Sequence, residues 1–444
     1  MAARAGARGA RGRAIVLGVM IAGVAAGCTV PAPTPAASDS SSSASIAPVD
    51  GSAAACAPNI EEIVARDDTQ STDAVSEELA DRYDAAAAAV FEEVRAFAPA
   101  AVVAVRGPDG TWAKAYGSAD LASEVPATTD MHQRVASVTK TFVGTALLQM
   151  ADEGMVSLDD AIDDYVPNVP NGSHITLREL ITMTSGLPNY SDDPAWWDAF
   201  VSDPTAAWAP QDLLAHAWAM PTSFAPGSDM EYSNTNFVLL GLVIEHVTGM
   251  PLAEALQTRI LDPLQLDATT YPSDATMPTP HLSGYTLDSA PPPGTTWVDA
   301  TGWNPSAAGA SGAMVSRADD LLTWGRVLAT GQGVLSASAQ QERLAALGTT
   351  NLGLGRFYGQ AIMCADQWIG HDGNISGYNT MLRYNSDTDT TIVVEATGLD
   401  ATGTPPRVYV IEEYFAALAT IAGHPFTPKV IPPEFQFQVP IPEL

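Results

Sequence analysis

Lysine is scarce in this chain of 444 residues, which contains three: Lys114, Lys140 and Lys429. Lysine and arginine together number 20 against 51 aspartates and glutamates, so the formal net charge is −31. Proteins bind nucleic acids through clusters of basic side chains that neutralise phosphates, and this surplus of acid leaves no basic patch. The composition therefore excludes a nucleic-acid partner, and a hydrophobic content of 46% excludes a chain that is disordered throughout.

The start of the chain lacks the length of apolar sequence that a membrane span needs. Four arginines precede residues 14–27, a stretch of apolar and small side chains that is shorter than the roughly 20 residues needed to cross a bilayer. This pattern is typical of a signal peptide, so residues 1–27 are predicted to be removed. The sequence from Val24 to Cys28 resembles the lipobox of bacterial lipoproteins. We therefore expect an exported protein whose Cys28 is lipid-anchored to the outer face of the cell membrane; an ordinary secretory signal is the alternative.

Two cysteines remain once Cys28 is assigned to a lipid. Cys56 and Cys364 could pair in an oxidising compartment and fix the N-terminal segment to the body of the protein, or both could stay unpaired. Between residues 29 and 58 the chain is rich in proline, alanine and serine, a composition typical of an extended tether. The sequence therefore predicts a spacer over 28–76 and leaves the state of these two cysteines open.

Among the three lysines, Lys140 alone has a serine three residues before it, in Ser137-Val138-Thr139-Lys140. On a helix this spacing places both side chains on one face, so the amine can reach the hydroxyl and take its proton. The amine must be uncharged to do so, which requires burial or nearby positive potential. Apolar residues recur at helical spacing from 142 to 150 and predict that burial. A helix-capping serine followed by a solvent-exposed lysine is the alternative.

Two further polar clusters follow along the chain. Tyr232 and Asn234 open a helical pattern; a phenol near a lysine cation loses its proton more readily, and an amide can hold a substrate amide. His371 and Gly373 precede a strand-like run, where the glycine would let a ligand lie along the strand edge. The histidine could donate to a substrate or adjust the charge on Tyr232. Taken singly, these clusters are also typical of a capped helix and a turn.

In this order, the three clusters resemble the motifs of the serine DD-peptidases, class C β-lactamases and related esterases, the penicillin-recognising hydrolases. The matching motifs are Ser137-x-x-Lys140, Tyr232-x-Asn234 and His371-x-Gly373. The likeness continues through residues 156–160, 180–188, 226–249 and 312–316 and covers about residues 77–422. The resemblance implies a β-lactamase/transpeptidase-like α+β fold, in which an antiparallel sheet is flanked by helices and carries a mainly helical inserted subdomain.

The resemblance also implies roles for individual residues. Ser137 would attack the substrate carbonyl and Lys140 would take its proton. Tyr232 would carry protons through acylation and deacylation. Asn234 would orient the acyl side of the substrate, and His371 would occupy the electrostatic position that many relatives fill with lysine.

The third cluster carries further expectations about substrate binding. The resemblance implies that the backbone N–H groups of Ser137 and of Asn374, the residue after Gly373, would bind the oxyanion. Asp372 stands where many relatives have a small hydroxyl residue that helps to bind a carboxylate. A carboxylate there would repel such a substrate unless a cation intervenes, and Arg356 is the candidate cation. This departure lowers the expectation of β-lactam hydrolysis and leaves ester or amide cleavage open.

Hydrophobic periodicity divides the chain into sheet and helical parts. Strand-like runs lie at 100–106, 111–117 and between 360 and 396, helices are predicted at 77–97, 317–329 and 408–421, and residues from about 141 to 302 are mainly helical. Sheet residues from both ends with helices between them indicate an α+β domain over 77–424, with a cleft at the junction. Residues 425–444 are rich in proline and are predicted to form an extended tail.

These observations predict a monomeric serine hydrolase that works through an acyl-enzyme on a D-Ala-D-Ala-type peptide, a β-lactam or a small ester. A catalytically silent surface lipoprotein with the same fold is the alternative, and a tethered structural protein is a further one. No cofactor or metal is expected, because the seven histidines lack the spacing of a ligand set. The helical part contains four tryptophans that could line the pocket or belong to the core, namely Trp196, Trp197, Trp208 and Trp218.

Overall fold

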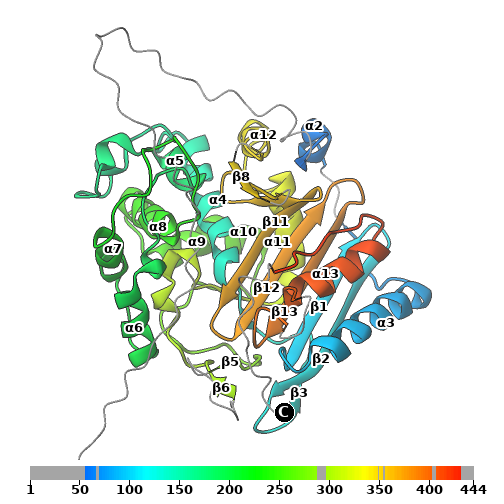
Figure 1. Ribbon diagram of the computed structural model, residues 1–444. Helices are drawn as coiled ribbons and strands as arrows, with labels where there is room; N and C mark the ends of the chain where they lie inside the picture. The colour runs from blue at the N-terminus through cyan, green and yellow to red at the C-terminus, as the bar shows by residue number, and fades with distance from the viewer. Residues whose placement is uncertain are drawn as a thin grey trace, which may run out of the picture. The chain divides into compact units, whose positions relative to one another are not determined.

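The computed structural model describes residues 56–66, 70–287, 297–348, 350–353, 356–402 and 407–431. At its centre is a nine-stranded antiparallel sheet with the order β3-β2-β1-β13-β12-β11-β10-β9-β8 (Figure 1). The strands are β1 (Ala100–Gly107), β2 (Gly110–Asp120), β3 (Val125–Pro126), β8 (Thr350–Gly353), β9 (Arg356–Tyr358), β10 (Met363–Ala365), β11 (Trp368–Ile375), β12 (Tyr378–Asn385) and β13 (Thr390–Thr397). Two short ribbons pair β4 (Gln133–Arg134) with β7 (Val315–Ser316) and β5 (Tyr285–Leu287) with β6 (Trp297–Asp299).

The central pair of strands comes from opposite ends of the chain. β1 pairs with β13 from Ala101 opposite Ala396 to Arg106 opposite Thr391, and β1 also forms a tight hairpin with β2. Both β1 and β13 are buried along nearly their whole length; β1 is rich in alanine and valine, and β13 is rich in the β-branched residues threonine, valine and isoleucine, which favour strands. The predicted antiparallel α+β architecture, with sheet residues from both ends, is confirmed.

Helices cover both faces of this sheet. The helices of the described residues are α2 (Ile60–Val64), α3 (Glu77–Val94), α4 (Thr139–Asp152), α5 (Leu177–Ile181), α6 (Pro194–Ser202), α7 (Pro210–Trp218), α8 (Asn234–Thr248), α9 (Leu252–Leu256), α10 (Asp262–Leu264), α11 (Ala318–Thr330), α12 (Ala337–Ala345) and α13 (Val410–Ile421). Helices α3 and α13 pack together on one face, while α11 packs on the other (Figure 1). Each face therefore has its own apolar core, and the larger core continues into the helical part.

The helical part extends from α4 through α10 and lies to one side of the sheet (Figure 1). Its longest helix, α8, is buried on most sides and packs against α4, α5, α7 and α9. In the described ranges, no single helix has the length and apolar character of a membrane span. The bent pair formed by α8 and residues Leu252–Leu264 meets the same test of length and composition, with a bend of 79°.

The N-terminal segment packs on this body from residue 56 onward. Cys56 forms a disulfide with Cys364 of β10 across 308 residues of sequence, which settles the state of these cysteines. Helix α2 follows, and Arg66 then donates to Tyr384 and to the backbone oxygen of Ser386. The part of the predicted spacer that is described, 56–66 and 70–76, is therefore docked on the body. Cys28 lies outside the described residues.

The C-terminal segment also returns to the β10–β11 hairpin. His424 and the backbone N–H of Thr427 both bind Asp366 in the turn between these strands. The backbone N–H of Lys429 donates to Glu412 of α13 at 2.6 Å. The predicted tail is thus packed from 425 to 431, and its remainder lies outside the described residues.

Candidate active site

Ser137 lies at the junction of the sheet and the helical part. It follows β4 and belongs to a single 3-10 turn, Ala136–Val138, that runs directly into α4. The preceding residue, Ala136, has a φ of +48°, a left-handed conformation that a residue with a side chain rarely adopts. Strain of this kind persists where the surrounding structure enforces it, and it clusters at active sites. Ser137 keeps part of its surface open, whereas both of its neighbours are buried.

The amine of Lys140 is fully enclosed among oxygen atoms. Its Nζ atom lies 3.0 Å from Ser137 Oγ and 2.7 Å from both Asn234 Oδ1 and the backbone oxygen of Ser311. Burial lowers the pKa of Lys140 well below its ordinary value. An uncharged amine has two hydrogens and one lone pair, so the hydrogens can bind Asn234 and Ser311 while the lone pair faces the Ser137 hydroxyl. Lys140 is therefore in the position and in the uncharged state that a general base requires.

Tyr232 lies beside this pair, immediately before α8. The Lys140 Nζ atom is 4.9 Å from the centre of its ring. Burial raises the pKa of Tyr232, and the hydroxyl of Ser137, to which it hydrogen-bonds, opposes that shift in part. The phenol is therefore protonated next to an uncharged amine. The expectation that a lysine cation would help Tyr232 to lose its proton does not match this arrangement.

Asn234 is the first residue of α8, and its amide is used within the site. Its Oδ1 atom accepts from Lys140, and its Nδ2 atom lies 3.3 Å from Ser191 Oγ. The backbone N–H of Asn234 donates to Asn189 Oδ1 at 3.1 Å, which fixes the start of the helix. Asn234 thus orients the general base while one edge of its side chain lines the cavity.

β11 passes so close to Ser137 that residue 373 has no room for a side chain. A Cβ atom at Gly373 would lie 2.2 Å from the backbone oxygen of Val135 and 3.1 Å from the backbone nitrogen of Ser137. Glycine is therefore required for the close approach of two backbones. The approach brings Asn374 to the same cavity as Ser137, where the two backbone N–H groups can act on one oxyanion.

His371 lies in β11 itself rather than before a strand, and its ring is uncharged. Its Nδ1 atom lies 2.6 Å from the backbone oxygen of Asp372, which identifies Nδ1 as the protonated nitrogen. Its Nε2 atom lies 3.4 Å from the hydroxyl of Tyr358. Burial lowers the pKa of His371 to about 3. The position that many relatives fill with a lysine cation is therefore neutral in this chain.

Asp372 and Arg356 are not brought to the cavity. Asp372 accepts from Arg383 at 2.7 and 2.8 Å, and Arg356 Nη1 lies 4.0 Å away. Burial acts to raise the pKa of Asp372, but the two guanidinium groups outweigh it and lower that pKa. Arg356 itself binds Glu412 of α13 at 2.9 Å. Because side chains alternate along a strand, Asp372 points away from the face that carries His371. Arg356 therefore cannot serve as the predicted substrate-binding cation.

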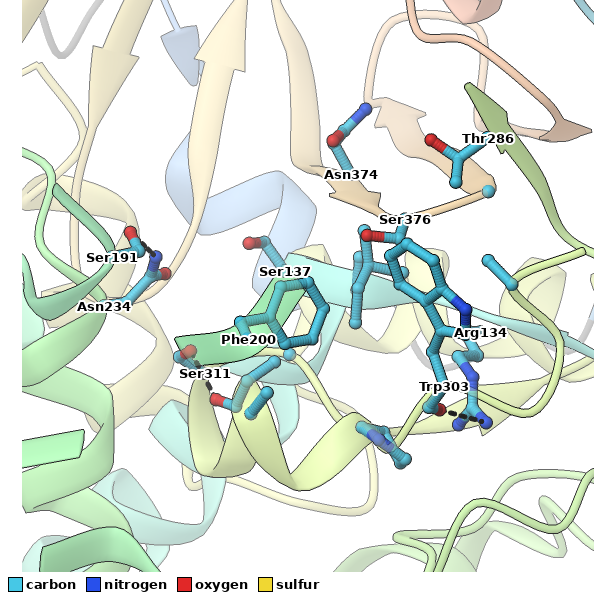
Figure 2. Close-up of a pocket in the computed structure, with 18 of the residues that line it drawn as sticks. Arg134, Ser137, Ser191, Phe200, Asn234, Thr286, Trp303, Ser311, Asn374 and Ser376 are labelled. Carbon is cyan, nitrogen blue, oxygen red and sulfur yellow. Dashed lines mark hydrogen bonds between the residues drawn. The ribbon is translucent and has the colours of Figure 1, made fainter. Parts of the chain in front are cut away.

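A cavity of about 420 Å³ opens in front of Ser137 (Figure 2). One wall is aromatic: Trp196 stacks on Phe200 with ring centres 5.2 Å apart, and Phe200 meets Trp303 edge-on at 5.6 Å. Trp197 lines the same cavity and is 37% exposed. Figure 2 shows Ser137 between Asn234 on one side and Asn374 and Ser376 on the other.

The remaining two tryptophans singled out from the sequence do not line this cavity. Trp208 packs behind Trp196 with ring centres 6.3 Å apart, and Trp218 packs against the larger core. The aromatic wall thus uses half of the predicted set and adds two residues, Phe200 and Trp303. Phe200 lies four residues after Trp196, a helical spacing that could have revealed it.

Two other site residues were not predicted. Ser311 contributes its backbone oxygen to Lys140, a role that does not depend on the side chain, although it directly precedes the segment 312–316 that resembled the family. Tyr358 contributes its hydroxyl to His371 and a ring whose centre lies 6.0 Å from that of Tyr232. No sequence pattern that we recognised marks Tyr358.

Comparison with known proteins agrees with this geometry. The family model described as Beta-lactamase matches residues 87–412, well over half of the chain. The chain belongs to the Beta-lactamase family. Its fold and its family relationships are those of the serine β-lactamase and transpeptidase superfamily and support a serine hydrolase.

Two solved structures resemble this Beta-lactamase family member over most of their length. A D-stereospecific amidohydrolase from Streptomyces sp. is 33% identical, with a TM-score of 0.64, over 70% of this chain and 94% of that one. A D-amino acid amidase from Ochrobactrum anthropi SV3, complexed with L-phenylalanine amide, is 25% identical, with a TM-score of 0.64, over 72% of this chain and 91% of that one.

Curated relatives match over a shorter stretch. Protein flp of Staphylococcus aureus (strain MW2) is 32% identical over 184 residues, which are 40% of this chain and 36% of that protein. Penicillin-binding protein 4* of Bacillus subtilis (strain 168) is 29% identical over 170 residues, 38% of this chain and 37% of that protein. The chain thus matches little more than a third of the length of these relatives.

Proposed function

We propose that the protein is a serine amidohydrolase that forms an acyl-enzyme with small amides or esters bearing an apolar or aromatic acyl group. The observation that carries this proposal is the uncharged amine of Lys140, held 3.0 Å from Ser137 Oγ by two other oxygen acceptors. A base already in its reactive form, next to a hydroxyl that opens on a cavity, is suited to nucleophilic catalysis.

The reaction would proceed in two steps that share the same groups. Ser137 Oγ bonds to the substrate carbonyl carbon as its proton passes to Lys140 Nζ, and the backbone N–H groups of Ser137 and Asn374 bind the oxyanion. The C–N bond then breaks while the Tyr232 phenol gives a proton to the departing nitrogen and regains one from Lys140. Water hydrolyses the ester by the reverse sequence, releasing the acid and restoring the Ser137 hydroxyl.

An uncharged leaving group is favoured by the distribution of positive charge. Arg356 and Arg383 are paired with acids on the opposite face of the sheet. Arg134 is the one cation among the described residues that line the cavity, and it is buried and donates to the backbone oxygens of Ala275, Thr301 and Trp303. A terminal carboxylate, as in a D-Ala-D-Ala peptide, would lack an available cation, whereas an amide or ester would need none.

The acyl group is proposed from the aromatic wall and from the relatives. Stacked rings of Trp196 and Phe200 and the edge of Trp303 offer an apolar surface suited to a large or aromatic side chain. The two structural relatives at 25–33% identity are a D-stereospecific amidohydrolase and a D-amino acid amidase. D-Phenylalanine amide is therefore the first substrate to test.

The experiment compares three substrates on the purified protein: D-phenylalanine amide, an acetylated D-alanyl-D-alanine peptide and a chromogenic cephalosporin. We expect the amide to have the highest kcat/KM. Ser137→Ala should abolish its turnover, and Lys140→Met should lower it by about 10² to 10⁴-fold, while Lys114→Met, a surface control, should not. Preference for the peptide with the free carboxylate would overturn the amidase assignment. Absence of turnover and of Ser137 labelling by a fluorophosphonate would favour the silent binding protein.

We also propose that the protein works outside the cell membrane, anchored through a lipid on Cys28. The disulfide between Cys56 and Cys364 supports an oxidising compartment, because such bonds persist mainly in exported proteins. Labelled palmitate should enter the wild-type protein and not Cys28→Ala, which should appear in the soluble fraction. Equal membrane retention of both forms would argue against this anchor.

A further inference from the structure

Among the described residues that line the catalytic cavity, one is a carboxylate, and the mechanism does not use it. Among the described residues that line the cavity, Asp400 and Arg134 are the charged ones. Asp400 follows the end of β13 and is exposed to solvent. A carboxylate on the wall of a cavity lined mainly by apolar, hydroxyl and amide side chains is a candidate for setting the orientation and charge of the ligand.

The backbone that carries Asp400 is fixed by three hydrogen bonds. Gly398 N–H donates to Gly377 O at 3.0 Å, Leu399 N–H donates to Phe97 O at 2.8 Å, and Val410 N–H donates to Asp400 O at 3.0 Å. Gly377 and Gly398 have φ values of +83° and +102°, which other residues rarely adopt. The segment is therefore held in one conformation, and the carboxylate is presented from a rigid support.

Asp400 has no basic partner within the described ranges. In that part of the chain, no ion pair and no other side chain engages its carboxylate, which accepts from its own backbone N–H, and the Nη2 atom of Arg134 donates to three backbone oxygens. Although Asp400 remains exposed, desolvation by the groups around it raises the pKa of its carboxyl. A cationic ligand would supply the positive charge with which this carboxylate can pair.

The position of Asp400 sets how far that cation lies from the reacting bond. Asp400 lies three residues beyond the end of β13, which is separated from β11 by β12, and neighbouring strands are about 4.8 Å apart. Gly373, the β11 residue beside Ser137, pairs with Thr380, which pairs with Glu395, so Asp400 is also displaced along the strands and lies about 10 Å or more from Gly373. One extended residue spans about 3.5 Å, so the cation would lie about three residue lengths or more from the scissile carbonyl.

We propose that Asp400 binds an ammonium group of the substrate, so that the preferred substrate is a short peptide amide whose amine lies at least about three residue lengths from the scissile bond. An amino terminus or the side-chain amine of a lysine-like residue would satisfy the same geometry. The acidic surplus of the whole chain, −31, acts in the same direction by attracting cations. The inference rests on the proposed amidase activity and names its substrate class.

The test pairs each cationic substrate with a neutral one of matched shape. Glycyl-glycyl-D-phenylalanine amide is compared with its N-acetyl form, and N-acetyl-lysyl-D-phenylalanine amide with its norleucine analogue. We expect the wild-type protein to favour one or both cationic members by about 5- to 10-fold in kcat/KM at low salt, with the preference shrinking as salt is added. The pair that shows the preference identifies the source of the amine.

Two variants assign the preference to one residue. Asp400→Asn should remove the preference while leaving turnover of the neutral substrates unchanged within about twofold. Asp198→Asn, which removes an exposed carboxylate from α6 outside the cavity, should keep it. Equal rates for cationic and neutral members in the wild-type protein, or a preference that survives in Asp400→Asn, would overturn the inference and leave the amidase proposal intact. Failure of all four amides would instead contradict the amidase proposal.

Discussion

Lys140 and His371 are both basic residues that burial holds in their uncharged forms. For Lys140 the uncharged form is the reactive one, because it can accept the proton of Ser137. For His371 the two ring nitrogens are already engaged, one by the oxygen of Asp372 and the other by Tyr358. Neither of these basic groups therefore provides a cation beside the nucleophile, and in the proposed mechanism stabilisation of the oxyanion falls to backbone N–H groups.

Burial of neutral His371 should make stability depend on pH. Its pKa is about 3 in the folded protein and about 6.5 in an unfolded chain, so the unfolded state binds more protons between these values. The free energy of unfolding should therefore fall as pH is lowered through this window, by about 3 kcal/mol at pH 4 relative to pH 7 from this residue. Urea unfolding at both pH values should show a smaller fall in His371→Gln.

The control is His174→Gln, because His174 is exposed in a short 3-10 turn and should leave the dependence unchanged. NMR of the ring protons should show no titration of His371 between pH 5 and 8. A titration midpoint near 6.5 for this residue would refute the assignment.

At the scale of the element, the two faces of β11 contact different parts of the protein. One face presents His371 to the catalytic residues, and the other presents Asp372 to two arginines and to the layer of α13. Between them, Gly373 allows the strand to touch the Ser137 turn. The geometry of the oxyanion site is thus a property of the strand position rather than of one side chain.

Adding a methyl group at residue 373 should separate these elements. In Gly373→Ala the new Cβ atom would lie 2.2 Å from the backbone oxygen of Val135, so the strand must move away from Ser137. We expect kcat to fall by about 10² to 10³-fold, as on loss of an oxyanion donor. Gly302→Ala is the matched control, since no atom lies within 4 Å of a Cβ atom there. Near-normal kcat in a folded Gly373→Ala would show that the close approach is dispensable.

The same strand shows what sequence reasoning can and cannot reach. Ser137 and Lys140 are linked by local helical geometry, so their contact follows from spacing. Asp372 and Arg356 were given a substrate role from their position near a motif, whereas the alternation of β11 and the partner Glu412, 56 residues after Arg356, direct them elsewhere. His371 was placed before a strand because glycine and polar residues interrupt the apolar pattern of β11. Tyr358 depends on tertiary packing, which leaves no local signal.

At the scale of the whole molecule, both ends of the described chain are attached to the β10–β11 hairpin. The N-terminal side is attached through the disulfide to Cys364, and the C-terminal side through Asp366. These attachments lie at the far end of the strand that carries His371. The terminal segments, which composition alone assigned to a spacer and a tail, therefore help to hold the strand that carries His371 in position.

Removal of the disulfide should weaken the fold and leave the chemistry in place. The double variant Cys56→Ser/Cys364→Ser frees a loop of 308 residues in sequence, and loss of a long-range disulfide typically costs about 2 to 5 kcal/mol. The melting temperature should fall accordingly, while kcat below the transition should stay within a few-fold of the wild type. Cys28→Ser should leave the melting temperature unchanged. Equal melting of the double variant and the wild type would show that the bond adds no stability.

The pairing of β1 with β13 has a consequence for the growing chain. Ser137 leaves the ribosome long before residues 390–397, yet β13 lies in the middle of the sheet and β11 carries Asn374, the proposed second oxyanion donor. A nascent chain that stops before β11 contains the nucleophile but not the second N–H group proposed to bind the oxyanion. Contacts between residues so far apart in the sequence also form slowly. Hydrolytic competence should therefore emerge late, in one step, as the final third of the chain closes the sheet.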